Sequence, residues 1–348
     1  MDVRISPGKF WGMRRLADRD GFCRIVATDQ RELLAEPIAA ARGVPVAPYP
    51  DVAGLVTALA TELQSEASAM LLDPIYGYLH TVDQLDPAKG LMLSYESLYM
   101  SRDLGGVRME PIPGWSVEKI RNLGADAVKV LALYRADMDA AARQHQEDFV
   151  QAAGEACERH DIPMLLEILV YPLDGQSDED YQASREQLVV DSVAPFRDPK
   201  FKADIYKLEP PGPLKGVAAP DTAAGQRQLA AYHRLTDGLP APWVLLSAGM
   251  NKPDFRQSLD YAYRCQASGY LAGRALWSQA PPLFPDTEAI ARSLREESVP
   301  YMRELNETTR ASGTPWYRHP AHSDGIEHGY PLDRDFAAHY TTGAPATV

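Results

Sequence analysis

The sequence has few cysteines and no long apolar run, and each of these features excludes a class of protein. The three cysteines, Cys23, Cys157 and Cys265, lie far apart and form no Cys-x-x-Cys pair. Such an odd, sparse set predicts a reducing compartment and no disulfide framework. No apolar run approaches the roughly 18 residues of a membrane-spanning helix, and the basic N-terminus lacks the apolar stretch of a signal peptide. We therefore expect a cytoplasmic protein with no membrane partner.

Positive charge is also scarce. The 348 residues include 35 lysines and arginines against 48 aspartates and glutamates, so the formal net charge is −13. A nucleic-acid-binding protein would need a basic face, and we therefore expect no nucleic-acid partner. The same net charge repels small anions, so a few local cations would have to hold an anionic substrate.

The motifs of several catalytic classes are missing as well. None of the eight histidines belongs to a His-x-His or His-Glu-x-x-His arrangement, which argues against a metal centre. No cysteine stands at a predicted strand end beside a histidine, and the Gly-x-Ser-x-Gly motif of serine hydrolases is absent. No Gly-x-Gly-x-x-Gly motif follows the first apolar segment, which argues against a doubly wound nucleotide-binding sheet. We expect neither a metal nor an organic cofactor.

The sequence does contain a regular alternation of short apolar segments and helical patterns. Near-continuous apolar strands are typical of a parallel sheet that is covered on both faces. Eight strand segments, most followed by a helix, predict an α/β fold of the (β/α)8 TIM-barrel class. The predicted strands are Cys23–Thr28, Ala69–Leu72, Leu91–Ser94, Ala127–Leu133, Met164–Val170, Asp204–Leu208, Trp243–Ser247 and Tyr270–Ala272. The predicted helices are Pro50–Glu66, Ser116–Leu123, Asp137–His160, Asp180–Val193, Thr222–Thr236, Lys252–Ala267 and Thr287–Arg310.

The domain boundaries follow from this alternation. A single barrel domain is expected over residues 1–310, with an N-terminal helix at about residues 9–20. Residues 311–348 are rich in proline, histidine and glycine, and we expect a tail that is partly irregular. Barrels of this size often form homo-oligomers, although no segment of the sequence identifies an interface.

Two lysines interrupt the apolar strands: Lys207 in the sixth and Lys129 in the fourth. Burying an ammonium is costly, and the usual escape is a lowered pKa that leaves a neutral amine able to attack a carbonyl. If both lysines point into one site, each cation disfavours the other, which is typical of Schiff-base chemistry. The alternative is that each lysine forms an ordinary buried ion pair. Glu209 shares the strand parity of Lys207 and is interpreted as ion-pair support.

Polar side chains gather at the carboxyl ends of the predicted strands, where TIM barrels carry their active sites. Asp29 and Gln30 end the first strand, Asp73 ends the second, and Glu167 lies in the fifth. We predict acid-base work for Glu167, because it faces the same barrel mouth as both lysines. Asp29, Gln30 and Asp73 are candidate substrate contacts. Asp73 precedes a proline, so a structural role as a loop cap is an equal alternative.

The last two strands are followed by segments that suit a phosphate group. Ser247, Ala248 and Gly249 come after the seventh strand, and Gly273 and Arg274 come after the eighth. Small residues let backbone N–H groups approach an anion, and an arginine adds a charge-assisted fork. TIM barrels commonly hold phosphate in these two loops. The sequence therefore predicts a phosphate site here, with a plain strand-to-helix turn as the alternative for the first segment.

As a set, these segments resemble the class I tagatose 1,6-bisphosphate aldolase family, to which the sulfofructose-phosphate aldolases are related. The resemblance runs over about residues 20–277 in a single order. It is carried by Ala27–Arg31, Leu71–Gly77, Gly124–Lys129, Leu166–Leu169, Lys207–Glu209, Leu246–Gly249 and Gly273–Trp277, with weaker matches at Tyr95–Glu96, Trp115–Val117 and Pro315–Trp316.

The resemblance implies a TIM barrel and a metal-independent aldol cleavage through a lysine imine. It matches Lys207 to the Schiff-base lysine, Lys129 to a second active-site lysine and Glu167 to the acid-base residue. It matches Asp29 and Gln30 to contacts with substrate hydroxyls. The implied phosphate site consists of Ser247, Gly249, Gly273 and Arg274. The implied substrate is tagatose 1,6-bisphosphate or a related ketose phosphate, cleaved reversibly to dihydroxyacetone phosphate and an aldehyde.

Three segments depart from the family pattern, and all border the end of the substrate that is distant from the imine. Glu32 stands where the family commonly has a small residue, residues 210–213 make the loop after the catalytic strand stiffer, and Tyr134-Arg135 replaces paired tyrosines. The chemistry is therefore better defined than the substrate. The candidate contacts for a second anion are Arg31, Arg102, Arg108, Arg135 and Lys252, although surface solvation is the expected role for most of them.

Alternatives remain open at this point. One is another imine-forming enzyme on the same barrel, such as a sulfofructose-phosphate, deoxyribose-phosphate-type or keto-acid aldolase. Another is a catalytically inactive relative that senses a metabolite. A metal-dependent aldolase is disfavoured by the histidine pattern.

Overall fold

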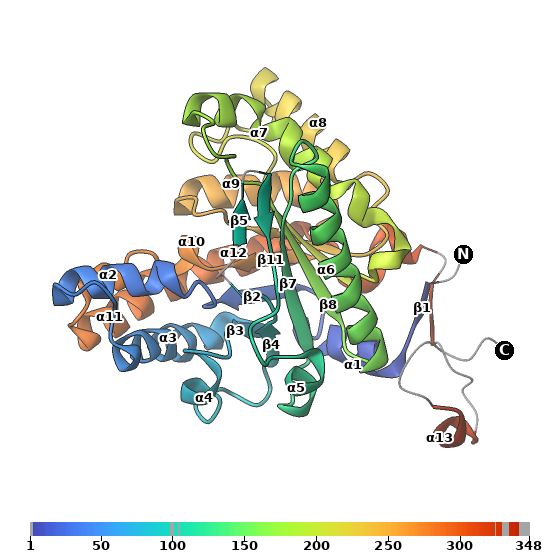
Figure 1. Ribbon diagram of the computed structural model, residues 1–348, viewed down its shortest axis with the longest axis horizontal. Coiled ribbons are helices and arrows are strands. Elements are labelled where there is room, and N and C mark those ends of the chain that lie inside the picture. The colour runs from blue at the N-terminus through green and yellow to red at the C-terminus, as the bar shows by residue number, and fades with distance from the viewer. Residues whose placement is uncertain (1–2, 98–100, 104, 324, 329–333, 341–348) are drawn as a thin grey trace.

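Eight parallel strands close into a barrel at the centre of the molecule (Figure 1). The computed structural model describes residues 3–97, 101–103, 105–323, 325–328 and 334–340. The strands follow one another around the barrel in the order β10, β11, β2, β3, β4, β7, β8, β9. They are β2 (Cys23–Ala27), β3 (Ala69–Leu72), β4 (Gly90–Ser94), β7 (Ala127–Leu133), β8 (Met164–Leu169), β9 (Ile205–Leu208), β10 (Trp243–Leu246) and β11 (Gly269–Ala272). The predicted TIM barrel is confirmed.

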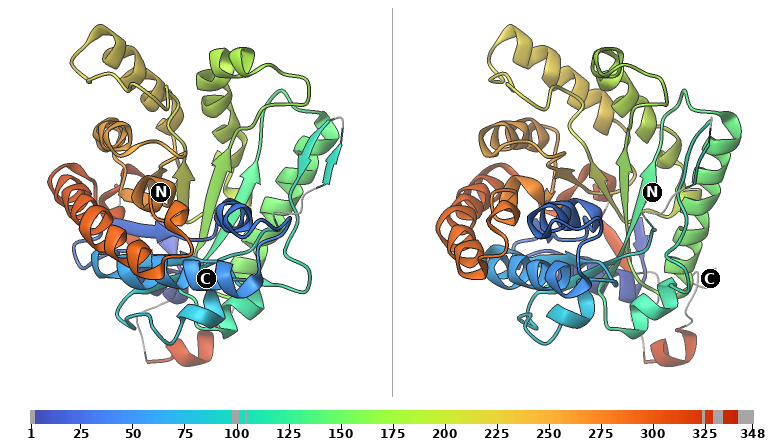
Figure 2. Two further views of the ribbon diagram at one scale, coloured as in Figure 1. Left: turned by 90° about the vertical axis from the view of Figure 1, so that its left-hand side faces the viewer. Right: turned by 60° about the vertical axis from the view of Figure 1, so that its left-hand side comes forward.

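Helices cover the outside of the barrel in every view (Figure 2). They are α1 (Pro7–Leu16), α2 (Glu32–Arg42), α3 (Tyr49–Leu63), α4 (Tyr78–Thr81), α5 (Val117–Asn122), α6 (Ala140–Arg159), α7 (Asp178–Val193), α8 (Ala223–Thr236), α9 (Lys252–Arg264), α10 (Arg274–Trp277), α11 (Thr287–Ser293), α12 (Val299–Ser312) and α13 (Phe336–His339). A short antiparallel hairpin, β5 (Ser101–Asp103) and β6 (Gly106–Arg108), follows β4. Short 3₁₀ helices cover Gln64–Glu66, Pro195–Arg197, Pro199–Phe201, Pro281–Leu283, Trp316–Arg318 and Pro320–His322.

Alternate side chains of each barrel strand point inward to the barrel axis or outward to the helices. In β2, Ile25 belongs to the apolar cluster inside the barrel, whereas Val26 packs in the cluster between strands and helices. Leu165 of β8 and Ile205 of β9 also lie in the inner cluster. Burial on both faces explains why these strands are continuous apolar runs in the sequence. A charged residue at an inward position of such a strand therefore needs a partner inside the barrel.

The predicted helical patterns all fall on helices, and side-chain caps fix several of the starts. Ser116 Oγ accepts the N–H of Lys119 at 3.2 Å and so caps the start of α5. Thr222 Oγ1 accepts the N–H of Gly225 at 3.0 Å and starts α8 in the same way. The long helix predicted over residues 287–310 is divided into α11, a π-helical segment (Leu294–Ser298) and α12.

Two helices differ from the expectation. The N-terminal helix covers Pro7–Leu16 rather than residues 9–20. Pro7 suits the first turn of a helix, and the chain after Leu16 turns at Gly21 (φ 91°) to enter β2. Helix α2 was not predicted, because Pro37 lies inside it and interrupts the helical pattern.

The end of the barrel opposite to the strand carboxyl ends is closed by α1 and by part of the tail. Met13 and Leu16 of α1 and Trp316 of the tail are buried in the apolar cluster that fills the barrel interior. The first described strand, β1 (Val3–Ile5), pairs in parallel with β12 (Ile326–His328) beside α1 (Figure 1). Within the described residues, no helix has the length and apolar character that a membrane span requires.

Candidate active site

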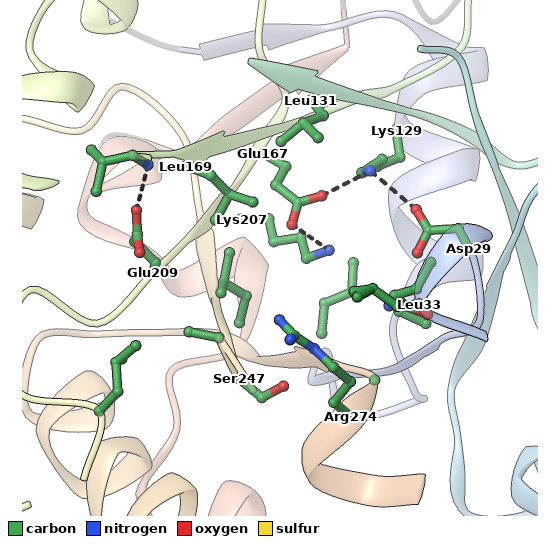
Figure 3. A pocket seen from close by; sticks show the side chains of 18 of the residues that line it. Asp29, Leu33, Lys129, Leu131, Glu167, Leu169, Lys207, Glu209, Ser247 and Arg274 are labelled. Carbon is green, nitrogen blue, oxygen red and sulfur yellow. Dashed lines mark hydrogen bonds and ion pairs between the residues drawn. The ribbon is translucent and has the colours of Figure 1, made fainter. Parts of the chain in front are cut away.

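The carboxyl ends of the barrel strands surround a cavity of about 380 Å³ (Figure 3). Most of the site residues predicted from the sequence line this cavity. Those that line it are Asp29, Gln30, Lys129, Glu167, Lys207, Ser247, Gly273 and Arg274. Gly249 does not line the cavity itself but packs against the guanidinium of Arg274. Asp73 is outside the cavity lining.

Lys207 occupies an inward position of β9, two residues after Ile205 of the inner apolar cluster. Its residue is only 4% exposed, and its Nζ atom lies 2.8 Å from Oε1 of Glu167. The strand register pairs Lys207 with Glu167 on β8, which brings the amine and the carboxylate to one level of the barrel. The amine therefore points into the cavity, as a nucleophile at this position must.

Lys129 lies on β7 and is surrounded by three carboxylates. Its Nζ atom is 3.0 Å from Oδ2 of Asp29, 2.6 Å from Oε1 of Glu96 and 2.9 Å from Oε2 of Glu167. Burial alone would lower the pKa of Lys129, but the three carboxylates outweigh burial and raise it well above its usual value. Lys129 is therefore a permanent cation, fixed in place by its neighbours.

Glu167 connects the two lysines. Oε1 contacts Lys207 and Oε2 contacts Lys129, so one carboxylate holds both amines (Figure 3). Burial acts to raise the pKa of Glu167, but Lys129 and Lys207 together lower it below its usual value. Burial also acts to raise the pKa of Asp29, but Lys129 and Lys207 together lower it below its usual value. Glu167 is thus an ionised base within reach of the amine that has to lose a proton.

Glu96 is a site residue that the sequence analysis did not select. It is 1% exposed, and its second oxygen, Oε2, accepts the N–H of Leu131 at 3.2 Å. Glu96 lies in the loop just after β4, which is where the other strand-end carboxylates were found. The strand-end rule that selected Asp29 and Asp73 therefore contained the signal for Glu96 too.

The predicted phosphate segments lie at the lower edge of the cavity in Figure 3. Ala248 and Gly249 have positive φ angles of 47° and 76°, and in the described part of the chain their N–H groups donate to no carbonyl. A Cβ atom at Gly249 would lie 3.0 Å from Cζ of Arg274, so a glycine leaves room for the guanidinium. Arg274 points toward the amine of Lys207. Ser247 and Gly273 complete a polar edge that can accept an anion.

Asp73 has the loop-capping role that was the alternative in the sequence analysis. Its Oδ1 atom accepts the N–H groups of Ile75 and Tyr76 at 2.7 and 2.8 Å and lies 3.8 Å from Nε of Arg31. The residue is fully buried, and burial raises the pKa of this carboxyl. The structure therefore does not bring Asp73 to the cavity.

Glu209 forms a separate ion pair beside the cavity. Its Oε2 atom contacts Nη2 of Arg185, and its Oε1 atom accepts the N–H of Val170 at 2.7 Å. Arg185 also donates to the carbonyl oxygen of Gly212 at 2.7 Å. Glu209 thus joins the loops after β8 and β9, in agreement with its interpretation as support.

Comparison with known proteins agrees with this geometry. Residues 23–279 match the model of the DeoC/LacD family aldolases. Tagatose 1,6-diphosphate aldolase of Lactococcus lactis subsp. lactis is 31% identical over 327 residues, which cover 90% of this chain and 98% of the relative. Tagatose 1,6-diphosphate aldolase 1 of Streptococcus mutans serotype c is 32% identical, covering 87% of this chain and 96% of the relative.

Solved structures share the fold at low sequence identity. An archaeal fructose 1,6-bisphosphate aldolase superposes with a TM-score of 0.54 at 15% identity, covering 86% of this chain and 98% of that one. Fructose-bisphosphate aldolase from Plasmodium falciparum gives a TM-score of 0.62 at 12% identity, covering 90% of this chain and 98% of that one. The family predicted from the sequence is confirmed. This chain belongs to the DeoC/LacD family of aldolases, which are carbon–carbon lyases.

Proposed function

We propose that this chain is a class I aldolase that cleaves a ketose phosphate through an imine at Lys207. The observation that carries the proposal is the Lys207 amine, which lies inside the barrel 2.8 Å from a carboxylate and faces a cavity lined by Arg274. The names of the relatives support a ketose phosphate as the substrate.

Imine formation needs a neutral amine, and Glu167 is placed to accept the proton of Lys207. The freed amine attacks the C2 carbonyl of the ketose, and one proton of the attacking nitrogen passes to the carbonyl oxygen to give a neutral carbinolamine. Glu167 then returns its proton to the departing hydroxyl, which leaves as water. The product is an iminium between C2 and the lysine nitrogen.

The iminium accepts the electrons of the bond that breaks. Glu167, again a carboxylate, takes the proton of the C4 hydroxyl as the C3–C4 bond cleaves, and the bonding pair forms an enamine on the lysine nitrogen. The aldehyde leaves. Glu167 can return the proton to C3, and water then hydrolyses the imine to release dihydroxyacetone phosphate and Lys207.

Lys129 positions Glu167 and supplies a fixed positive charge to the reacting region. Because it is held by Asp29, Glu96 and Glu167 together, its ammonium cannot move with the substrate. A preorganised charge of this kind stabilises the negative oxygen that develops during attack on the carbonyl. We therefore assign Lys129 to electrostatic support, and Asp29 and Gln30 to contacts with substrate hydroxyls.

Replacing Arg274 with alanine should weaken substrate binding more than it slows the chemistry. A hydrogen bond to a charged group contributes about 1.5–3 kcal/mol, so KM should rise roughly 10- to 100-fold. Steady-state kinetics with a ketose phosphate separates KM from kcat. The Arg274→Lys variant keeps the positive charge but loses the two-pronged contact of a guanidinium. Its KM should lie between the KM of the unaltered chain and that of the alanine variant. A variant whose kcat falls while KM is unchanged would contradict this assignment.

Borohydride trapping tests the proposed function directly. The full chain is incubated with dihydroxyacetone phosphate and borohydride, and the modified peptide is mapped by mass spectrometry. The expected product of trapping is a reduced adduct on Lys207. In a separate activity assay, we expect the enzyme to keep its full activity in the presence of EDTA. Absence of any adduct with dihydroxyacetone phosphate and with ketose phosphates would favour the catalytically inactive alternative. Loss of activity with EDTA, restored by a divalent metal, would favour a metal-dependent aldolase.

A further inference from the structure

The charged side chains that line the cavity are almost all paired with one another. Lys129 pairs with Asp29, Glu96 and Glu167, Lys207 pairs with Glu167, and Arg185 pairs with Glu209. Each of these seven side chains is buried, with no more than 8% of the side chain exposed. A buried, paired charge is not available to a ligand without breaking its pair.

Two charged side chains of the cavity lining have no such partner among the described residues: Arg274 and Glu32. Arg274 has the opposite sign to a phosphate and lies beside the backbone amides of Ala248 and Gly249. Glu32 is the first residue of α2, is exposed, and lines the cavity together with Leu33. The cavity therefore offers one free positive charge and one free negative charge.

The candidates for a second-anion contact whose side chains the structure describes do not change this balance. Arg31 donates to Ser94 Oγ at 2.9 Å, and Arg135 forms a two-pronged pair with Asp137 at 2.8 and 2.7 Å. The side chain of Arg102 lies outside the described residues. The four other candidates do not line the cavity; they are Arg31, Arg108, Arg135 and Lys252.

Apart from the ion pairs, Arg274 and Glu32, the cavity lining is uncharged. Tyr181 and Gln182 of α7, Leu169 and Val170 near the end of β8, and Leu214 after β9 form this part of the wall. Amide and phenol groups can bond to sugar hydroxyls, whereas neither neutralises a phosphate. This wall therefore suits a hydroxylated chain.

We propose that the substrate carries a single phosphate, bound at Arg274, and that its far end is an uncharged hydroxylated chain. Resting on the proposed function, this makes the substrate a ketose 1-phosphate in preference to a ketose 1,6-bisphosphate or a sulfonated ketose 1-phosphate. A second anion in the part of the cavity that Glu32 lines would be repelled by the carboxylate of Glu32. The net charge of −13 adds to this repulsion. Hydroxyl groups, in contrast, can donate to Glu32.

The test uses the aldol direction, because only the aldehyde then varies. The full chain is given dihydroxyacetone phosphate together with either D-glyceraldehyde or D-glyceraldehyde 3-phosphate, and kcat/KM is measured for each aldehyde. We expect a preference of at least about ten-fold for the unphosphorylated aldehyde. Equal use of the two aldehydes, or a preference for the phosphorylated one, overturns the inference. Borohydride trapping with dihydroxyacetone phosphate alone reports separately on the proposed function.

A charge-neutral variant tests the part that is assigned to Glu32. Glu32→Gln should raise the relative kcat/KM for the phosphorylated aldehyde by roughly three- to ten-fold. Glu36→Gln is the matched control, since Glu36 lies one turn later on α2 and lines a different pocket. It should leave the ratio unchanged. An unchanged ratio in Glu32→Gln, or an equal change in both variants, shows that Glu32 does not set the preference.

Discussion

Replacing Lys207 with methionine is expected to abolish both turnover and borohydride-dependent labelling by dihydroxyacetone phosphate. Methionine has nearly the length of lysine and no charge, so it fills the same space without leaving a cavity. Glu167 keeps its second partner in this variant, because Lys129 lies 2.9 Å from its other oxygen. The fold should therefore persist, which circular dichroism can verify, while the attacking nitrogen is gone.

The matched control is Lys200→Met, at a partly exposed lysine of the 3₁₀ helix that precedes β9. Its activity and its labelled peptide should be those of the unaltered chain. The assignment of Lys207 is refuted if the methionine variant is folded and keeps more than a few per cent of the activity. A reduced adduct on another lysine would have the same meaning.

Glu167→Gln should slow turnover by about 10²–10⁴-fold, the range for loss of a positioned general acid-base group. Glutamine keeps the shape of the side chain and can still contact both amines, but it cannot take the C4 hydroxyl proton. The iminium should still form, more slowly, because the Lys207 amine remains. Turnover and trapping are therefore expected to separate: the adduct accumulates in minutes with little release of aldehyde.

Glu155→Gln provides the control for this variant, because Glu155 lies on the surface helix α6 and pairs with Gln151. Its rate should be unchanged. If Glu167→Gln loses trapping and turnover to the same extent, Glu167 acts in imine formation alone. If it loses neither, another group carries the proton, and Asp29 or Glu96 becomes the residue to replace.

The barrel and the three charged residues at the centre of the site were predictable from the sequence, because a buried parallel strand is a continuous apolar run in which a charged residue stands out. Lys129, Glu167 and Lys207 each interrupt an apolar run, and a charge there has to face the barrel interior. These side chains lie close together because of the strand register, which cannot be read from the sequence. In that register, Glu167 of β8 pairs with Lys207 of β9. The resemblance to a family supplied the roles, and the register explains why those roles are compatible.

Other parts of the site were not predictable for reasons that are equally physical. Strand-end position selects carboxylates but does not give the direction in which a loop turns them. Asp73 turns back to cap its own loop, whereas Glu96 turns inward to Lys129. Arg31 illustrates the same point, because its unusual backbone (φ 37°, ψ −90°) sends the guanidinium beneath the loop toward Ser94.

Closure of one end of the barrel also determines where reactants enter and products leave during turnover. Among the described residues, Met13, Leu16 and Trp316 fill one end of the barrel, and the reactive nitrogen faces the cavity at the opposite rim. Sugar, aldehyde and the hydrolytic water therefore share that rim. Departure of the aldehyde makes room there for the water that hydrolyses the imine in the last step.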